Sequence, residues 1–300
     1  MAALKQIKTK IRSVEKTQKV TKAMEAVSAA KMRKAQNRAL GGRAYARAAV
    51  SVLARVSGSK ELNAHPLIAV RVVKHTLYIV ITSDKGLAGA LNSAVLRATF
   101  ADMSRTEASV VAVGRKAQDF FTNRGIKVLK FHANTDEVST ALINTLVHKA
   151  AELFASGEVD CVKIAYQNFV STFEQRPTLR TIFPLSLKEL SQVVADIVPA
   201  RGVFAHAFDQ ESQPHTYTIE PSEGEVLGVL LPMLASVFIY HALLESQASE
   251  HSARMVAMKS ASDKAEEMTH SLTLKFNKAR QAAITREVSE ITGGMEAMAA

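Results

Sequence analysis

Residues 234–283 read LASVFIYHALLESQASEHSARMVAMKSASDKAEEMTHSLTLKFNKARQAA, and this stretch decides the fold. It carries a repeat of seven residues, with alternating spacings of three and four, that predicts a left-handed supercoil with another helix. The repeat is rich in Ala, Ser and Met rather than Leu, so we expect helices that approach closely but hold each other weakly. Its positions are Leu234, Val237, His241, Leu244, Ala248, His251, Met255, Met258, Ser262, Ala265, Thr269, Leu272, Phe276, Ala279 and Ala283.

The helix that carries this repeat is predicted over residues 222–292. Ser222 and Glu225 fit a capping box at its start. The nineteen residues 226–244 have no formal charge and approach the ~20 residues that span a bilayer. Glutamates rather than lysines or arginines flank this run, and it contains Pro232, which favours a helix buried in protein over a membrane span.

A second long helix is predicted over residues 3–56. Its apolar positions are Leu4, Ile7, Ile11 and Val14, and the stripe resumes after a slip of three residues at Thr17, Val20, Met24 and Val27. At ~1.5 Å per residue such a helix is about 80 Å long, too long for a compact domain of this mass. The two terminal helices therefore bury their stripes most readily against each other, antiparallel.

The segment between them has a different pattern. Strands expected at residues 77–81, 109–114, 127–131 and 159–166 alternate with helices expected at 87–103, 115–123 and 137–155. This alternation predicts a parallel open sheet with helical crossovers. Residues 178–184 add an edge strand limited by Pro177 and Pro184, and residues 186–220 look irregular, with a further strand possible at 217–219.

The predicted fold is thus α/β: a long antiparallel coiled coil of the N- and C-terminal helices plus an inserted open-sheet, Rossmann-like α/β domain. The predicted boundaries are 1–58 for the first coil helix, 73–215 for the α/β domain and 220–300 for the second coil helix. Residues 1–58 and 220–300 would form one discontinuous coiled coil.

Charge is concentrated at the N-terminus. Residues 1–60 hold fifteen lysines and arginines against two acids, whereas residues 221–300 hold seven against ten. Such a basic segment indicates an acidic partner: nucleic acid, anionic lipid or an acidic protein surface. The single cysteine, Cys161, excludes an internal disulfide and a cysteine-based metal site. The N-terminus has no apolar run of the secretory type, and we interpret its basic amphipathic sequence as mature protein.

Five motifs resemble the γ subunit of F-type ATP synthases of the bacterial type. They occur in the right order over nearly the whole chain: TQKVTKAME at 17–25, KMRKA at 31–35, SDKGLAGALN at 83–92, ARMVAMK at 253–259 and NKARQAAITREVSEI at 277–291. Ala88 and Ala90 depart from the Cys and Gly that are usual in the third motif.

The resemblance implies the central rotor shaft of the proton-translocating ATP synthase. In that family the coiled coil penetrates a hexamer of α and β subunits, and the α/β domain sits on the membrane c-ring with the ε subunit. Rotation couples proton flow to ATP synthesis or hydrolysis in the hexamer. The resemblance therefore implies no catalytic residues, cofactor or metal in this chain. It also implies a peripheral position on the cytoplasmic side of the cell inner membrane.

The same resemblance implies which residues contact a β subunit. Arg254, Arg280 and Gln281 match the positions that meet an acidic β-subunit loop, with Arg280 the strongest candidate, because its planar guanidinium pairs with carboxylate in two places. Lys22 and Met24 are expected on the opposing helix near that contact. Further candidates on the next turns are Thr285, Glu287 and Glu290. The alternative for each residue is an ordinary solvated helix face.

Two other functions stay open from the residues alone. An enzyme is conceivable because residues 83–89 lie between a strand and a helix, where phosphate loops occur, but neither GxGxxG nor GxxxxGK[ST] is present. A nucleic-acid-binding coiled-coil protein could use the basic N-terminal helix. Against it, Tyr45 is the only aromatic residue among the first 60, so no stacking platform accompanies the cations.

Overall fold

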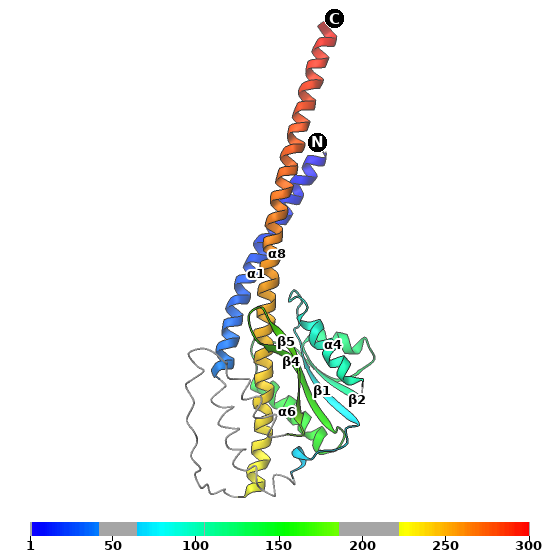
Figure 1. Ribbon diagram of the computed structural model, residues 1–300, viewed down its shortest axis with the longest axis vertical. Helices are drawn as coiled ribbons and strands as arrows, with labels where there is room; N and C mark the ends of the chain where they lie inside the picture. The colour runs from blue at the N-terminus through cyan, green and yellow to red at the C-terminus, as the bar shows by residue number, and fades with distance from the viewer. Residues whose placement is uncertain (1, 42–64, 105, 186–221, 300) are drawn as a thin grey trace. The chain divides into compact units, whose positions relative to one another are not determined.

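The computed structural model describes residues 2–41, 65–104, 106–185 and 222–299 (Figure 1). The chain divides into two compact units. The coil unit comprises Met1–Ala29 and Arg254–Ala300, and the sheet unit comprises Ala30–Ala253. Two helices contribute to both units: α1, Ala2–Gly41, and α8, Glu223–Ala299.

In the coil unit, α1 and α8 pair side by side and antiparallel, with both chain ends at the same end of the pair (Figure 1). Gln18 Nε2 of α1 donates to Glu266 Oε2 of α8 across the pair at 3.3 Å. The predicted repeat on α8 is confirmed, because each of its positions from Met255 to Ala283 is buried or half-buried. Ser262 and Ala265 are among the most buried of them. The observed heptads therefore form the seam of an antiparallel coiled coil.

The predicted slip in the α1 stripe is wrong. Val20 and Val27 are more than half exposed, whereas Thr21 and Ser28 are buried. The spacing of Leu4, Ile7, Ile11 and Val14 instead continues without interruption through polar positions. A search for apolar residues missed this register because Gln18, Thr21 and Ser28 occupy the seam. Small and polar seam residues fix the register of a coiled coil at a cost in stability.

The sheet unit is built on five strands in the order β3-β2-β1-β4-β5. The strands are β1, His75–Ile81; β2, Glu107–Val113; β3, Lys127–His132; β4, Cys161–Phe169; and β5, Gln175–Phe183. All neighbouring pairs are parallel except β4 with β5. The helices of this unit are η1, Pro66–Ile68; α4, Leu91–Met103; α5, Arg115–Thr122; and α6, Thr140–Ala155.

Alternate residues of the buried strands serve two cores, one on each face of the sheet. Leu77, Ile79 and Ile81 pack with α6 and the start of α8, whereas Tyr78 and Val80 pack with α4 and α5. Burial on both faces is the reason that β1 reads as a continuous apolar run. The predicted α/β fold class is confirmed.

Several predicted limits of elements are corrected. Helix α4 begins at Leu91 rather than residue 87, because Leu87 and Gly89 have positive φ angles and form a turn before it. Helix α6 begins at Thr140 with Ser139 as its cap, and β4 spans Cys161–Phe169. Pro177 lies inside β5 instead of limiting it, because β5 is an edge strand and an outward position needs no amide hydrogen there.

Helix α8 begins with the predicted cap. Ser222 Oγ accepts the amide hydrogen of Glu225 at 3.3 Å. By length and composition α8 contains a stretch able to cross a membrane. Leu227, Leu231 and Ile239 of that stretch are nevertheless fully buried in the sheet core, although Val229 is exposed. The predicted boundaries at 58, 215 and 220 fall outside the described residues, which omit 42–64 and 186–221, as does the strand considered at 217–219, and the boundary at 73 stays a prediction.

Candidate functional site

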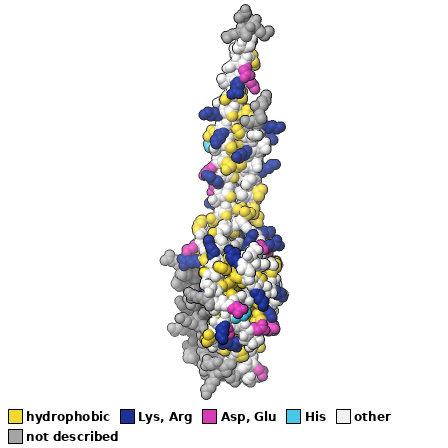
Figure 2. Space-filling view, turned by 90° about the vertical axis from the view of Figure 1, so that its right-hand side faces the viewer, with side chains coloured by type: hydrophobic (Ala, Val, Ile, Leu, Met, Phe, Trp, Pro, Cys, Tyr) yellow, Lys and Arg dark blue, Asp and Glu magenta, His cyan; other side chains and the backbone are white. Residues whose placement is uncertain are grey.

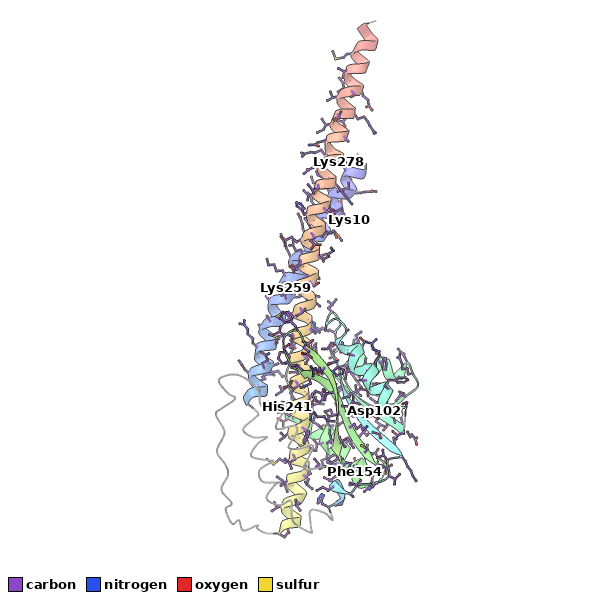
Figure 3. The ribbon with its side chains drawn as sticks, in the orientation of Figure 1. Lys10, Asp102, Phe154, His241, Lys259 and Lys278 are labelled. Carbon is purple, nitrogen blue, oxygen red and sulfur yellow. The ribbon has the colours of Figure 1, made fainter. Side chains whose placement is uncertain are left out.

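The coil unit presents a strongly cationic surface. Residues 1–29 and 254–300 contain fourteen lysines and arginines against eight acidic residues. On the face that Figure 2 shows, basic side chains are spread along the coil and interspersed with apolar and some acidic side chains. Lys10, Lys259 and Lys278 mark three levels of this surface (Figure 3). Distributed charge of one sign attracts an acidic partner without fixing a single orientation.

Beyond the seam, α8 is exposed on all sides. Every residue from 284 to 295 is exposed, although α8 remains helical to Ala299. Four apolar residues with spacings of four, three and four residues form one stripe there: Ile284 is 51% exposed, Val288 57%, Ile291 65% and Met295 67%. We call this stripe the distal stripe. Helix α1 cannot cover it, because position 4 already opposes about residue 280 in the antiparallel register.

Four of the eight predicted contact residues border the distal stripe. At 100° per residue, Arg280 and Glu287 lie on one side of it, and Gln281 and Thr285 lie on the other. All four are exposed. Thr285 Oγ1 donates to the Gln281 carbonyl oxygen at 3.0 Å, which orders these two residues on one turn. Glu290 is also exposed but lies further round the helix.

Lys22 and Met24 do not lie at that level. Because Gln18 opposes Glu266, Lys22 opposes about residue 262, which is about 27 Å along the axis from Arg280. The nearest predicted residue on α8 is Arg254, which is half-buried and engaged in interactions. The expectation of one contact region is therefore corrected to two levels: one near Arg254, Lys22 and Met24, and one at the distal stripe.

In the sheet unit, α8 lies against the carboxyl end of β4. Ser249 Oγ donates to the Gln167 carbonyl oxygen at 3.1 Å, and Ser252 Oγ donates to the Thr172 carbonyl oxygen at 2.7 Å. The carboxylate of Glu245 accepts the amide hydrogen of Phe169 at 2.9 Å. Strand β4 adjoins β1 at the point where the strand order reverses, which is the usual ligand crevice of such sheets. Here side chains of α8 take that position.

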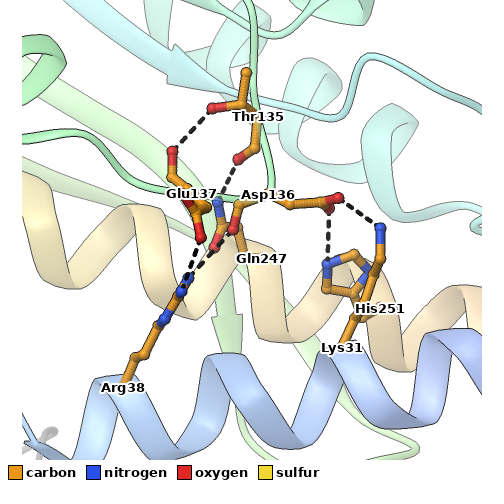
Figure 4. A network of polar contacts seen from close by, with 7 residues as sticks. All are labelled: Lys31, Arg38, Thr135, Asp136, Glu137, Gln247 and His251. Carbon is orange, nitrogen blue, oxygen red and sulfur yellow. Dashed lines mark hydrogen bonds and ion pairs between the residues drawn. The ribbon is translucent and has the colours of Figure 1, made fainter.

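The loop after β3 adds a second attachment (Figure 4). Gln247 Nε2 of α8 donates to the Thr135 carbonyl oxygen at 2.8 Å. Asp136 pairs with Lys31 of α1 at 2.5 Å and lies 3.7 Å from His251 of α8. The hydrogen bond from Lys31 lowers the pKa of Asp136, so this carboxylate stays ionised. Arg38 Nη1 of α1 donates to the Asp136 carbonyl oxygen at 3.3 Å.

These contacts define a helix–sheet junction formed by Glu245, Gln247, Ser249 and Ser252 of α8. The side chains of Gln247, Ser249 and Ser252 are almost fully buried. Sequence reasoning placed none of these four in a site, because single serines and glutamines on a long helix carry no motif. His251 was predicted only as a seam position. Asp136 is identified by its contacts with Lys31 and His251, which no sequence pattern indicates.

The enzyme alternative depended on the turn of residues 83–92, whose hydrogen bonds the structure shows. Asp84 Oδ1 accepts the amide hydrogen of Arg115 at 2.8 Å, and Thr82 Oγ1 accepts that of Ala117 at 2.9 Å. The Ser83 carbonyl oxygen accepts the amide hydrogen of Lys116 at 3.3 Å. The turn after β1 thus engages the first amide hydrogens of α5, the helix after β2, so its polar groups are used within the chain instead of facing a phosphate. A carboxylate at this position also repels phosphate.

The two departures in this turn are accommodated. Ala88 is 2% exposed, so its methyl group fills a buried position. Ala90 has a φ of −84°, a conformation open to any residue, so it does not require glycine. Asn92 ties the turn together, since its side chain accepts the Ser83 amide hydrogen at 3.0 Å and donates to Ser83 Oγ at 2.7 Å.

Comparisons with known proteins agree with this geometry. The profile of the ATP synthase family matches residues 3–298. The ATP synthase gamma chain of Heliobacterium modesticaldum is 41% identical, with 99% of this chain and 100% of that protein covered. The chain belongs to the ATP synthase gamma chain family. The gamma chain of Pelotomaculum thermopropionicum is 40% identical over 99% of this chain and 100% of that protein.

Chains of two solved ATP synthase structures share the fold. A chain of the Euglena gracilis mitochondrial ATP synthase assembly of OSCP, F1 and c-ring aligns with a TM-score of 0.65 at 19% identity, covering 99% of this chain and 95% of that chain. A chain of the Tetrahymena thermophila central stalk and c-ring structure aligns with a TM-score of 0.60 at 24% identity, covering 81% and 99%. These comparisons give the nucleic-acid alternative no support.

Proposed function

We propose that this gamma chain is the central rotor shaft of a bacterial F-type ATP synthase. In this proposal the coil unit turns within a ring of alternating α and β subunits. The sheet unit receives the rotation from a proton-driven c-ring and from the ε subunit. The observation that carries the proposal is the distal stripe. A helix that exposes four large apolar residues in one line is suited to a protein sleeve around it.

The weak seam supports rotation rather than permanent docking. Ser28, Thr21, Ser262 and Ala265 occupy its middle, so the pair is slender there. A shaft has to present different faces to three similar partners in turn. Small side chains and distributed charge meet that requirement, since a large apolar contact would hold one angle.

Arg280 is the residue through which we expect the shaft to act on a β subunit. It is exposed beside the distal stripe, and its guanidinium can form two parallel hydrogen bonds with an acidic loop. Gln281 and Thr285 would extend this contact on one side, and Glu287 and Glu290 on the other. Lys22, Met24 and Arg254 would form a second contact about 27 to 39 Å from Arg280 along the coil.

The helix–sheet junction would transmit torque between sheet and shaft. Polar contacts with defined directions resist twisting of α8 relative to β4 more than a smooth apolar surface would. The chain would hold no catalytic group of its own, and catalysis would take place in the hexamer. As a peripheral subunit it would lie on the cytoplasmic side of the cell inner membrane.

The proposal is tested by reversing one charge in the assembled complex. Arg280→Glu should lower ATP synthesis in inverted membrane vesicles by tenfold or more, on the basis of about 1.5–3 kcal/mol for a charged hydrogen bond. Lys278→Glu is the matched control, since it is an exposed cation two residues away and points to a different face.

Helicity by circular dichroism and the yield of assembled complex establish that both variants fold. Equal losses in the two variants would indicate general electrostatics, and unchanged synthesis in Arg280→Glu would exclude the contact. Failure of the wild-type chain to co-purify with two larger nucleotide-binding subunits would refute the rotor assignment itself.

A further inference from the structure

A cavity of about 420 Å³ lies between α6 and the edge strand β3, and none of its lining residues belongs to the helix–sheet junction. Its inner wall is apolar and reaches the middle of the sheet at Leu77 and Val111, with Leu146 of α6 opposite. This size falls within the range of small-molecule sites. The cavity exists because β3 is the outermost strand and is only partly covered by α6.

The rim of the cavity is basic. Lys130 and His132 contribute from β3, and His148 and Lys149 contribute from α6. Glu152 is the only acid in the lining, and it pairs with Lys149 at 3.0 Å. Lys130 has no ion pair with any residue that the structure describes. The β3 side of the rim thus holds an uncompensated positive charge.

His132 supplies the second observation. Its Nε2 is buried and has no hydrogen-bond partner among residues 2–41, 65–104, 106–185 and 222–299. Burial and the neighbouring charge of Lys130 lower the pKa of His132, so its ring is left neutral with an unsatisfied nitrogen. Buried polar atoms in folded proteins nearly always have a partner, which makes this nitrogen an unfilled position.

We propose that this cavity binds a small organic anion that carries an apolar body. The acidic head would accept hydrogen bonds from Lys130 and His132, and the body would lie against Leu77, Val111 and Leu146. A peptide strand paired with β3 would satisfy the backbone hydrogen bonds of this edge strand. It would leave the apolar part of the cavity empty. A bare inorganic anion would likewise leave the apolar part of the cavity empty.

The test uses the full chain and three probes that separate the two halves of the proposal. Octanoate carries both an anionic head and an apolar body, inorganic phosphate carries only charge, and octanamide carries only the apolar body. Binding is measured by isothermal titration calorimetry, and protection of Lys130 from acetylation by mass spectrometry locates the site in the chain and in the assembled synthase.

Octanoate should bind saturably and protect Lys130, with phosphate and octanamide at least tenfold weaker. Lys130→Gln should weaken octanoate at least tenfold, as expected when one charged hydrogen bond is lost. Lys127→Gln is the control, because Lys127 is exposed on the same strand and does not line the cavity. It should leave the affinity unchanged.

Three results would overturn the proposal. The first is no saturable binding of octanoate by the wild-type chain. The second is equal weakening by Lys127→Gln and Lys130→Gln. The third is equal affinity for octanoate and for phosphate or octanamide. An acidic peptide that protects Lys130 while octanoate does not would assign the edge to a protein partner instead.

Discussion

Removal of the hydrogen bonds at the helix–sheet junction should lower the coupling of proton pumping to ATP hydrolysis while the chain stays folded. The perturbation is the triple variant Gln247→Ala, Ser249→Ala and Ser252→Ala. These side chains donate to the carbonyl oxygens of Thr135, Gln167 and Thr172 at 2.8, 3.1 and 2.7 Å. Because all three donors are buried, the variant leaves acceptors without partners in the sheet unit.

The magnitude follows from two opposing effects. Each lost hydrogen bond costs about 1 kcal/mol of unfolding free energy. Alanine recovers roughly 0.4 kcal/mol at each position, because it has the highest helix propensity. The net loss is about 2 kcal/mol, and the three sites share one helix, so additivity is approximate. A loss of this size leaves the chain folded but loosens α8 against β4.

Urea unfolding of the full chain measures the stability, and the ratio of proton pumping to ATP hydrolysis in membrane vesicles measures the coupling. We expect the ratio to fall while hydrolysis continues. The control replaces Thr9, Thr17 and Thr273 by alanine. Their hydroxyl groups are exposed and donate to carbonyl oxygens of their own helices. A stability loss no larger than in the control would refute the energetic argument, and a normal ratio in the destabilised variant would refute torque transmission at the junction.

The remaining predictions concern the seam, the sheet and the loop after β3. Ala265→Pro should disrupt the coil unit by about 3 kcal/mol or more and lower helicity, whereas Ala265→Gly should cost only about 1 kcal/mol; normal assembly of the proline variant would contradict a continuous α8. Gly114→Ala should unfold the sheet unit, since the added carbon would lie 2.1 Å from the Thr82 carbonyl oxygen at a φ of +99°, and a soluble, thermally stable variant would count against this strand ending. Asp136→Asn should cost less than about 1 kcal/mol at neutral pH, because the carboxylate is exposed. Its folded-state pKa is lowered, so the wild-type advantage is present above pH ~4 and should vanish as the pH falls through the folded value; an advantage that persists in acid would disprove the ion pair.

The sequence predicted those parts of the fold in which burial of apolar side chains alone sets the pattern. The strands β1 and β2 are buried on both faces, and the α8 repeat extends over seven heptads, so their patterns are unambiguous. The α1 stripe was misplaced because Gln18, Thr21 and Ser28 lie in the seam, and hydrophobicity alone does not identify polar seam residues.

Part of the candidate site could be predicted from the sequence, and part could be found only in the structure. Arg280, Gln281 and Thr285 could be named because a local motif spans them. The junction of α8 with β4 could not, because its partners are backbone amide and carbonyl groups 76 to 112 residues away, and such groups are present in every sequence. The separation of Lys22 from Arg280 required the antiparallel register, which only the cross-helix contact of Gln18 with Glu266 supplied.

Asp84 has a consequence for the chemistry open to the sheet unit. Its sheet has the layout on which many proteins hold mononucleotides, and a protein of that kind would compete for the cell's most abundant phosphate compounds. With the Asp84 carboxylate accepting the amide hydrogen of Arg115, the domain uses the turn after β1 to hold the start of α5, where a nucleotide-binding domain would leave that turn open for phosphate. The Asp84 carboxylate thus gives this turn a structural role in a sheet of the nucleotide-binding type.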